Sequence, residues 1–167
     1  MWNKINKEAE LLYNNCIKKG VFITTAESCT GGLIASSIVS ISGSSNIFKS
    51  SLITYSNEMK TKLLNIDYKI IEINGAVSEI VATQMAENVL DILDADVSIA
   101  VTGIAGPGGG SKDKPVGLVW IAIGNTNLTI TEKFLFSGDR LDVRKKNDSR
   151  VSETSKLSCY KYKILGI

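Results

Sequence analysis

The sequence contains no histidine, and this absence limits its chemistry more than any other feature of the composition. Without histidine there is no Ser-His or Cys-His catalytic pair, no His-ligated zinc and no side chain that ordinarily titrates near neutral pH. The three cysteines, Cys16, Cys29 and Cys159, are odd in number and far apart, which disfavours a disulfide framework and a cysteine-rich metal site. A general base in this chain must therefore be a lysine, a tyrosine or a carboxylate.

Long apolar runs and an excess of one charge are also missing. No run approaches the ~18 apolar residues that a membrane-spanning helix needs, and residues 1–10 are too polar for a signal peptide. Nineteen Lys and Arg against seventeen Asp and Glu give a formal net charge of +2, which does not favour nucleic acid or an anionic membrane as a partner. The chain has 167 residues, 44% of them hydrophobic, and is predicted to be one soluble, cytoplasmic domain.

Hydrophobic periodicity predicts an alternation of helices and strands. Helices are expected at residues 6–19, 31–40, 57–64 and after Ser78, where Val81, Met85, Val89 and Ile92 recur at helical spacing. Strands are expected at residues 21–26, 49–55, 96–101, 116–123 and 128–136. The last two strands must form an antiparallel hairpin, so the order predicts a three-layer α/β/α sandwich with a mixed sheet.

The end of the chain differs in character from the rest. Residues 147–167 lack a helical apolar stripe. We therefore expect one domain at residues 1–146 and an atypical tail at residues 147–167.

Hydroxyls and glycines crowd the junction between the first strand and the second helix, where residues 24–32 read TTAESCTGG. Such a junction favours bound anions, and a serine at its turn can act as a nucleophile. The alternative is that Ser28 or Thr30 caps the helix, which is the commoner role of such residues. Cys29 is the rival nucleophile, although an unpaired cysteine at a strand end is more often a small buried apolar residue.

Lys60 follows Ser56 and Asn57 by about one helical turn and can point back toward the strand end that carries Tyr55. Ser-Lys pairs are a variant of the catalytic triad. The variant requires a desolvated lysine, because a free lysine with a pKa of ~10.4 is almost fully protonated at neutral pH. The alternative is that Lys60 is a solvated surface charge.

A glycine-rich segment at residues 103–115 follows the third expected strand and matches neither standard nucleotide-binding fingerprint. Its glycines would let the backbone approach a ligand closely. Ser111 and Lys114 match the S-x-x-K pattern, but that pattern works on a helix, and we interpret the match as chance. Farther along, Arg140 and Arg144 could bind a phosphate or could be solvated charges.

Five segments in order resemble the CinA C-terminal domain family over about residues 5–146. They are TAESCTGG at 25–32, TYSN at 54–57 with Lys60, GAVS at 75–78, GIAGP at 103–107 with KPVG at 114–117, and SGDR at 137–140. The stand-alone members of this family are nicotinamide-nucleotide amidases. The resemblance implies hydrolysis of nicotinamide mononucleotide to nicotinate mononucleotide and ammonia, with no metal, no organic cofactor and a homo-oligomeric enzyme.

By the same resemblance, Ser28 would be the nucleophile, Lys60 its base and Tyr55 a hydroxyl that assists proton transfer. The arginines would bind the phosphate, and backbone N–H groups near residues 30–32 or 103–105 could hold the oxyanion. The implied substrate-binding residues are Thr30, Gly31, Gly32, Asn57, Thr102, Gly103, Ala105, Gly106, Arg140 and Arg144.

The resemblance fails after residue 146, where family members continue as an apolar-striped helix. Losing such a helix would expose part of the core, because each buried Leu contributes ~1.5–3 kcal/mol. Two alternatives therefore stand beside the amidase. One is a catalytically impaired nucleotide-binding module, and the other is a CinA-like interaction protein of competence or DNA damage. The near-neutral charge argues against direct contact with nucleic acid.

Overall fold

The computed structural model describes the backbone of residues 2–153 and the side chains of residues 5–146. Its elements are α1 (Trp2–Lys19), β1 (Ile23–Glu27), α2 (Leu33–Val39), the 3-10 turn η1 (Ser44–Asn46), β2 (Phe48–Ile53), α3 (Asn57–Leu64), α4 (Tyr68–Asn74), α5 (Glu79–Leu93), β3 (Val97–Gly103), β4 (Leu118–Asn125), β5 (Thr129–Leu135) and α6 (Arg140–Glu153).

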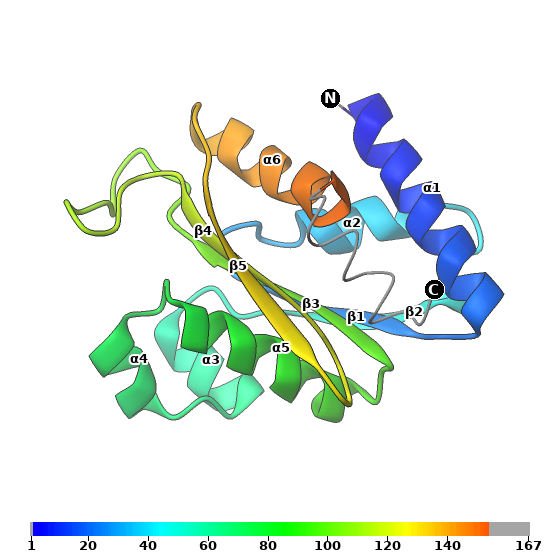
Figure 1. The fold of residues 1–167 in the computed structure, drawn as a ribbon, viewed down its shortest axis with the longest axis horizontal. Helices are drawn as coiled ribbons and strands as arrows, with labels where there is room; N and C mark the ends of the chain where they lie inside the picture. Colours follow the sequence, from blue (N-terminus) through cyan, green and yellow to red (C-terminus); the bar gives the residue numbers. More distant parts are fainter. Residues whose placement is uncertain (1, 154–167) are drawn as a thin grey trace.

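The five strands form one mixed sheet in the order β2-β1-β3-β4-β5. β1 runs parallel to β2 and β3, whereas β4 runs antiparallel to β3 and β5. Helices α1, α2 and α6 cover one face of the sheet, and α3, α4 and α5 cover the other (Figure 1). The predicted single α/β domain, with three layers and a mixed sheet, is confirmed.

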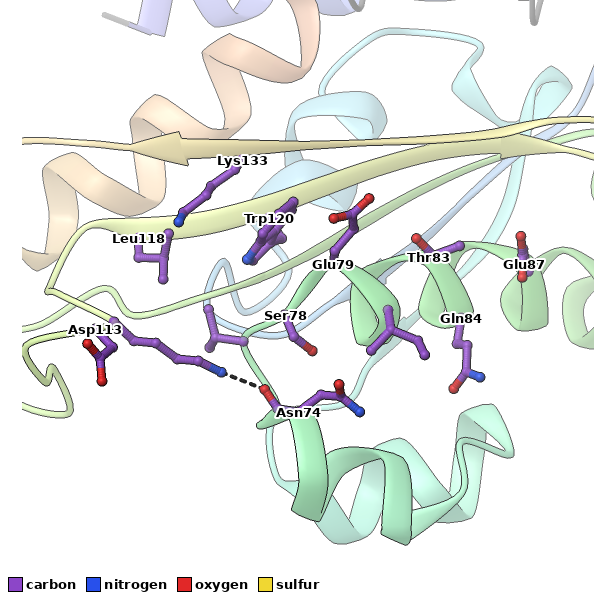
Figure 2. Close-up of a pocket in the computed structure, with 13 residues that line it drawn as sticks. Asn74, Ser78, Glu79, Thr83, Gln84, Glu87, Asp113, Leu118, Trp120 and Lys133 are labelled. Atoms are coloured by element: carbon purple, nitrogen blue, oxygen red, sulfur yellow. Dashed lines mark hydrogen bonds between the residues drawn. The ribbon is translucent and has the colours of Figure 1, made fainter.

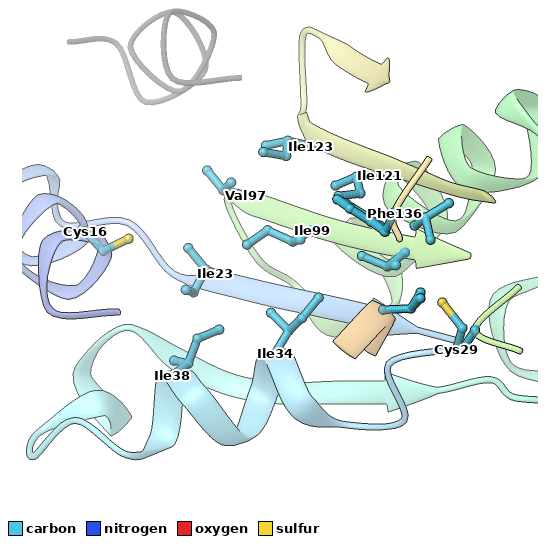
Figure 3. Packing of buried hydrophobic residues seen from close by; sticks show 14 of the residues in the cluster. Cys16, Ile23, Cys29, Ile34, Ile38, Val97, Ile99, Ile121, Ile123 and Phe136 are labelled. Carbon is cyan, nitrogen blue, oxygen red and sulfur yellow. The ribbon is translucent and has the colours of Figure 1, made fainter. Parts of the chain in front are cut away.

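The core has two parts, one on each face of the sheet. Between the sheet and α1, α2 and α6, Ile34 and Ile38 of α2 point at Ile23 and Ile99 of the strands (Figure 3). Between the sheet and α5, the core is built largely from alanines, valines and Met85. Every residue of β1 is buried, because the strand lies between two others with helices on both faces.

Parallel strands place their carboxyl ends at one edge of the sheet, and that edge is where ligands bind in α/β folds. The ladders of β1 continue past its end, because Ser28 N donates to Val101 O at 3.0 Å and Thr54 N donates to Glu27 O at 2.8 Å. The residues that follow β1, β2 and β3 are therefore fixed beside one another.

Helix α3 has the predicted bounds, but α4 was not predicted. It spans seven residues, too few for the apolar period to show, and Asp67 caps it by accepting from Lys69 N at 2.9 Å. Helix α5 follows Ser78 as predicted, yet the Ser78 hydroxyl donates to Gly75 O rather than capping the helix.

The expectation that Ile92 lies on the buried face of α5 is wrong. Its side chain is 39% exposed, while Ala82 and Ala86 are buried beside Val81 and Met85. The row of Val81 and Met85 and the neighbouring row of Ala82 and Ala86 both face the sheet. The centre of the buried face of α5 lies between these two rows, which leaves Ile92 at its edge.

The last described helix extends beyond the expected domain boundary. The backbone of α6 stays helical to Glu153, so the first seven residues of the expected tail continue this helix. The rest of that expectation, for residues 154–167, lies outside the described residues. In the part of the chain that is described, no helix has the length and apolar character that crossing a bilayer demands.

Candidate active site

Lys60 and Ser28 meet at the carboxyl ends of β1 and β2. The Lys60 ammonium Nζ lies 3.0 Å from Ser28 Oγ and donates to Thr54 O at 2.8 Å. Lys60 comes from the first turns of α3, and Ser56 caps this helix by accepting from Met59 N. The Lys60 side chain is 1% exposed, so it is not a solvated surface charge.

Burial lowers the pKa of Lys60 from 10.5 to about 8, with a smaller opposing effect from the Cys29 sulfur. The charged amine loses its hydration inside the protein, and no carboxylate among the described residues pairs with it to offset the loss. With a pKa of about 8, roughly a tenth of the molecules carry a neutral Lys60 at pH 7. A neutral amine at hydrogen-bond distance from a serine hydroxyl can accept its proton.

The surroundings of Cys29 do not favour it as a nucleophile. Its side chain is buried in the core beside α2, and burial raises the pKa of the thiol from 9.0 to about 12. Because the thiolate is the reactive form, a raised pKa disfavours reaction at this thiol. The interpretation of Cys29 as a small buried apolar residue is therefore the one that its surroundings support.

Glu27, to which the sequence analysis assigned no role, holds the start of α2 beside the site. It is fully buried, and its carboxylate accepts backbone N–H bonds from Gly32 at 2.8 Å, Ala35 at 2.8 Å and Ile34 at 3.3 Å. These N–H groups belong to the start of α2, so Glu27 occupies the anion-binding end of this helix. The sequence signal that could have indicated this contact is a glutamate that precedes two consecutive glycines, Gly31 and Gly32, at the start of a helix.

The turn between Glu27 and α2 departs from two expectations. The N-cap of α2 is Gly32, so neither Ser28 nor Thr30 caps the helix. Gly31 N donates to Ser28 O at 3.1 Å and Gly32 N donates to Glu27, so neither N–H is free for an oxyanion. Gly31 and Gly32 have φ values of 61° and 91°, which only glycine adopts without strain.

A cavity of about 260 Å³ opens in front of Ser28 and Lys60. Of the residues expected at the site, those that line it are Ser28, Tyr55, Asn57, Lys60, Thr102, Gly103, Ala105, Gly106 and Arg140. Four expected residues, Thr30, Gly31, Gly32 and Arg144, are not part of the lining. Cys29, Ala76, Val77, Ile104, Gly108 and Gly109 complete it.

Arg140 bridges two walls of this cavity. Its Nη1 donates to Gly106 O at 2.8 Å, and its Nη2 donates to the Tyr55 hydroxyl at 2.7 Å. The Tyr55 side chain is 59% exposed, and its hydroxyl is held by Arg140 rather than by Ser28 or Lys60. Both side chains stand at the rim of the cavity, where an incoming ligand can meet the guanidinium.

Arg144 lies on α6 and faces the turn instead of the cavity. Its Nη2 and Nε donate to Thr30 O at 2.8 and 3.2 Å. This pair of bonds ties α6 to the turn that follows Ser28. The geometry thus gives Arg144 a supporting contact, and its expected role on the phosphate stays a prediction.

The glycine-rich loop forms the far wall of the cavity. Ile104 N and Gly117 N are used in bonds to Leu118 O and Ile104 O, which close the base of the loop. The N–H groups of Ala105 and Gly106 have no acceptor within the described residues, and both residues line the cavity. Both N–H groups are therefore available to a ligand in the cavity.

Comparisons with known proteins agree with this fold. The family model for the CinA C-terminal domain matches residues 5–153. A CinA-like protein of Prochlorococcus marinus (strain AS9601) is 52% identical over 131 residues, which cover 78% of this chain and 31% of the relative. The chain spans about a third of the length of the curated relatives it matches.

Solved structures give the same result over nearly the whole fold. The competence or damage-inducible protein from Enterobacter asburiae has a TM-score of 0.87 at 32% identity, over 96% of this chain and 98% of that one. A competence/damage inducible protein from Agrobacterium tumefaciens has a TM-score of 0.86 at 37% identity, over 88% and 90% of the two chains. The chain belongs to the CinA C-terminal domain family.

Proposed function

We propose that this chain is an amidase that hydrolyses nicotinamide mononucleotide to nicotinate mononucleotide and ammonia. The observation that carries the proposal is the buried Lys60 Nζ at 3.0 Å from Ser28 Oγ, at the mouth of a cavity. The choice of substrate rests on the family resemblance of the five sequence motifs. The exposed guanidinium of Arg140 at the cavity rim is suited to the phosphate of such a substrate.

In the first half of the reaction, neutral Lys60 accepts the Ser28 proton as Oγ bonds to the carboxamide carbon. The carbonyl oxygen becomes an oxyanion, for which the N–H groups of Ala105 and Gly106 are the candidate donors. Lys60 then returns the proton to the nitrogen, the C–N bond breaks, and ammonia leaves. An ester between Ser28 and the nicotinoyl group remains.

In the second half, water attacks this ester while Lys60 again accepts a proton. The C–O bond to Ser28 breaks, Lys60 gives its proton back to Oγ, and nicotinate mononucleotide is released. Thr54 O accepts from Lys60 Nζ at 2.8 Å throughout, which aims the amine at Ser28 in both halves. One base thus serves both steps, and a lysine takes this role in a chain that has no histidine.

The test is ammonia release from nicotinamide mononucleotide, followed by chromatographic identification of nicotinate mononucleotide. We expect turnover with the mononucleotide and at most weak turnover with free nicotinamide, which lacks the phosphate for Arg140. Calorimetric binding of the mononucleotide without ammonia release would instead favour a nucleotide-binding module. If the protein shows neither binding nor turnover, the remaining candidate is an interaction protein, as the competence and damage names of the relatives suggest.

A further inference from the structure

Side-chain hydrogen bonds hold the connection between α4 and α5. Three consecutive carbonyls, those of Asn74, Gly75 and Ala76, each accept a side-chain donor. Lys114 Nζ donates to Asn74 O at 2.6 Å, Ser78 Oγ to Gly75 O at 2.8 Å, and Thr102 Oγ1 to Ala76 O at 2.9 Å. Since Ala76 and Val77 line the cavity at Ser28, these bonds fix one of its walls.

Lys114 is the contact that comes from the glycine-rich loop. Its match to S-x-x-K is not a catalytic pair, because Ser111 Oγ accepts from Lys114 N at 3.1 Å and Ser111 N donates to Lys114 O at 2.8 Å. These bonds make a tight turn that leaves the lysine side chain free to cross to α4. The dashed line that ends on Asn74 in Figure 2 marks the resulting bond.

The absence of a side chain at Gly75 leaves room for the Lys114 side chain. It has a φ of +76°, and a Cβ at this position would lie 2.6 Å from Lys114 Nζ. Any other residue would therefore be strained and would also displace the ammonium. The two residues are 39 positions apart in the sequence and fit each other at one point of the fold.

Lys114 and Asn74 also line a second cavity. A larger cavity of about 610 Å³ lies between α5 and the ends of β4 and β5, with Leu118 and Trp120 pointing into it (Figure 2). Lys114 lines the larger cavity, and Val77 lines both. The segment that Lys114 holds therefore lines both cavities, through Asn74 and Val77 on one side and Ala76 and Val77 on the other.

On the other side of the active-site cavity, Arg140 binds Gly106 O. The loop is thus tied at Gly106 and at Lys114, and Gly108 and Gly109 line the cavity between these ties. Glycines have no side chain with which to hold a position, so the two cationic contacts limit how far this stretch can move.

We infer that Lys114 is a positioning residue of the active site, which closes the glycine-rich loop against the α4–α5 connection and so shapes the substrate cavity. It does not reach Ser28 or Lys60, so it acts on substrate binding rather than on the chemical step. The inference rests on the proposed function for its kinetic part and on the Lys114–Asn74 bond for its structural part.

The kinetic test compares Lys114→Met with Lys112→Met. Lys112 is exposed in the same loop, with no hydrogen-bond partner among the described residues, which makes it a matched control. We expect Lys114→Met to raise KM for nicotinamide mononucleotide about tenfold, since a charged donor to a carbonyl is lost. Its kcat should stay within about twofold of the control, because Ser28 and Lys60 are untouched.

The structural test needs no turnover. Hydrogen exchange should be faster at the amides of residues 75–77 and 105–110 in Lys114→Met than in Lys112→Met, and equal in β1 and β3. If the parent neither binds nor hydrolyses the mononucleotide, the proposed function fails while exchange still tests the loop contact.

Two results would overturn the inference. One is equal exchange and equal KM in the two variants. The other is faster exchange throughout the protein with a loss of kcat and thermal stability, because that pattern would mean general destabilisation instead of a positioned loop.

Discussion

The most informative perturbation is pH, because the account depends on a lysine that is neutral often enough to act as a base. Lys60 is buried against Ser28 and Thr54 O, and this burial lowers its pKa from 10.5 to about 8. At pH 7 the neutral fraction is then about 9%, against about 0.03% for an ordinary lysine. Burial therefore raises the amount of active base about 300-fold.

The assay is kcat/KM for nicotinamide mononucleotide between pH 7 and pH 10, a range above the second pKa of a phosphate. We expect the value to rise about tenfold from pH 7 to pH 9 and to level off above that, since kcat/KM reports the free enzyme's essential base. Lys60→Arg should lose turnover at every pH, because arginine is never deprotonated in this range. A flat profile in the parent, or a midpoint near 10.5, would refute the reasoning.

The same pKa predicts how stability depends on pH. Below pH 8 the lysine is charged in both states, so the folded protein bears the full desolvation cost of about 3 kcal/mol. Between pH 8 and 10.5 the unfolded chain binds more protons, so this cost disappears as pH rises. In urea unfolding, the free energy of unfolding of the parent should therefore rise by about 3 kcal/mol relative to that of Lys60→Met between pH 7 and pH 10.5. A difference between the two proteins that does not change with pH would contradict this assignment.

Three further predictions concern single residues. Glu27→Gln should lower the free energy of unfolding by about 2–4 kcal/mol in urea, because an amide N–H would face the N–H groups of α2, whereas the exposed Glu72→Gln should change little. Gly117→Ala should cost at least about 3 kcal/mol, since its Cβ would overlap the Phe136 carbonyl at a φ of +92°, while Gly108→Ala has open space and should be nearly neutral in thermal unfolding. Cys29→Ala should retain turnover within about threefold, and native Cys29 should resist iodoacetamide; loss of all turnover would return the nucleophile role to Cys29.

Local patterns were enough to predict the elements that place the site. The β-branched run before Glu27 and the cap at Ser56 are local signals, and they put Ser28 and Lys60 at neighbouring strand ends. Helix geometry allowed Lys60 to point back toward the sheet, but a solvated surface charge was equally compatible with the local pattern. The pairing of the two side chains came from the family resemblance, and the structure places Lys60 Nζ 3.0 Å from Ser28 Oγ, 32 residues apart in the sequence.

The contacts that the sequence could not reveal join residues far apart or in uncommon positions. Glu27 caps a helix from five positions before Gly32, outside the usual N-cap position. The Tyr55 hydroxyl meets Arg140, 85 residues later, and no local pattern links the two. The same holds for Lys114 and Asn74, where only the folded loop shows which carbonyl the ammonium reaches.

In the proposed reaction, Ser28 and Lys60 act together as nucleophile and base. The measurement that tests it most directly is ammonia release from nicotinamide mononucleotide at pH 9 by Ser28→Ala, set beside Ser36→Ala as a control on the exposed side of α2. With both proteins shown to be folded by circular dichroism, the account predicts parental turnover for Ser36→Ala and a loss of at least about 10³-fold for Ser28→Ala. Turnover by Ser28→Ala equal to that of the parent would contradict it.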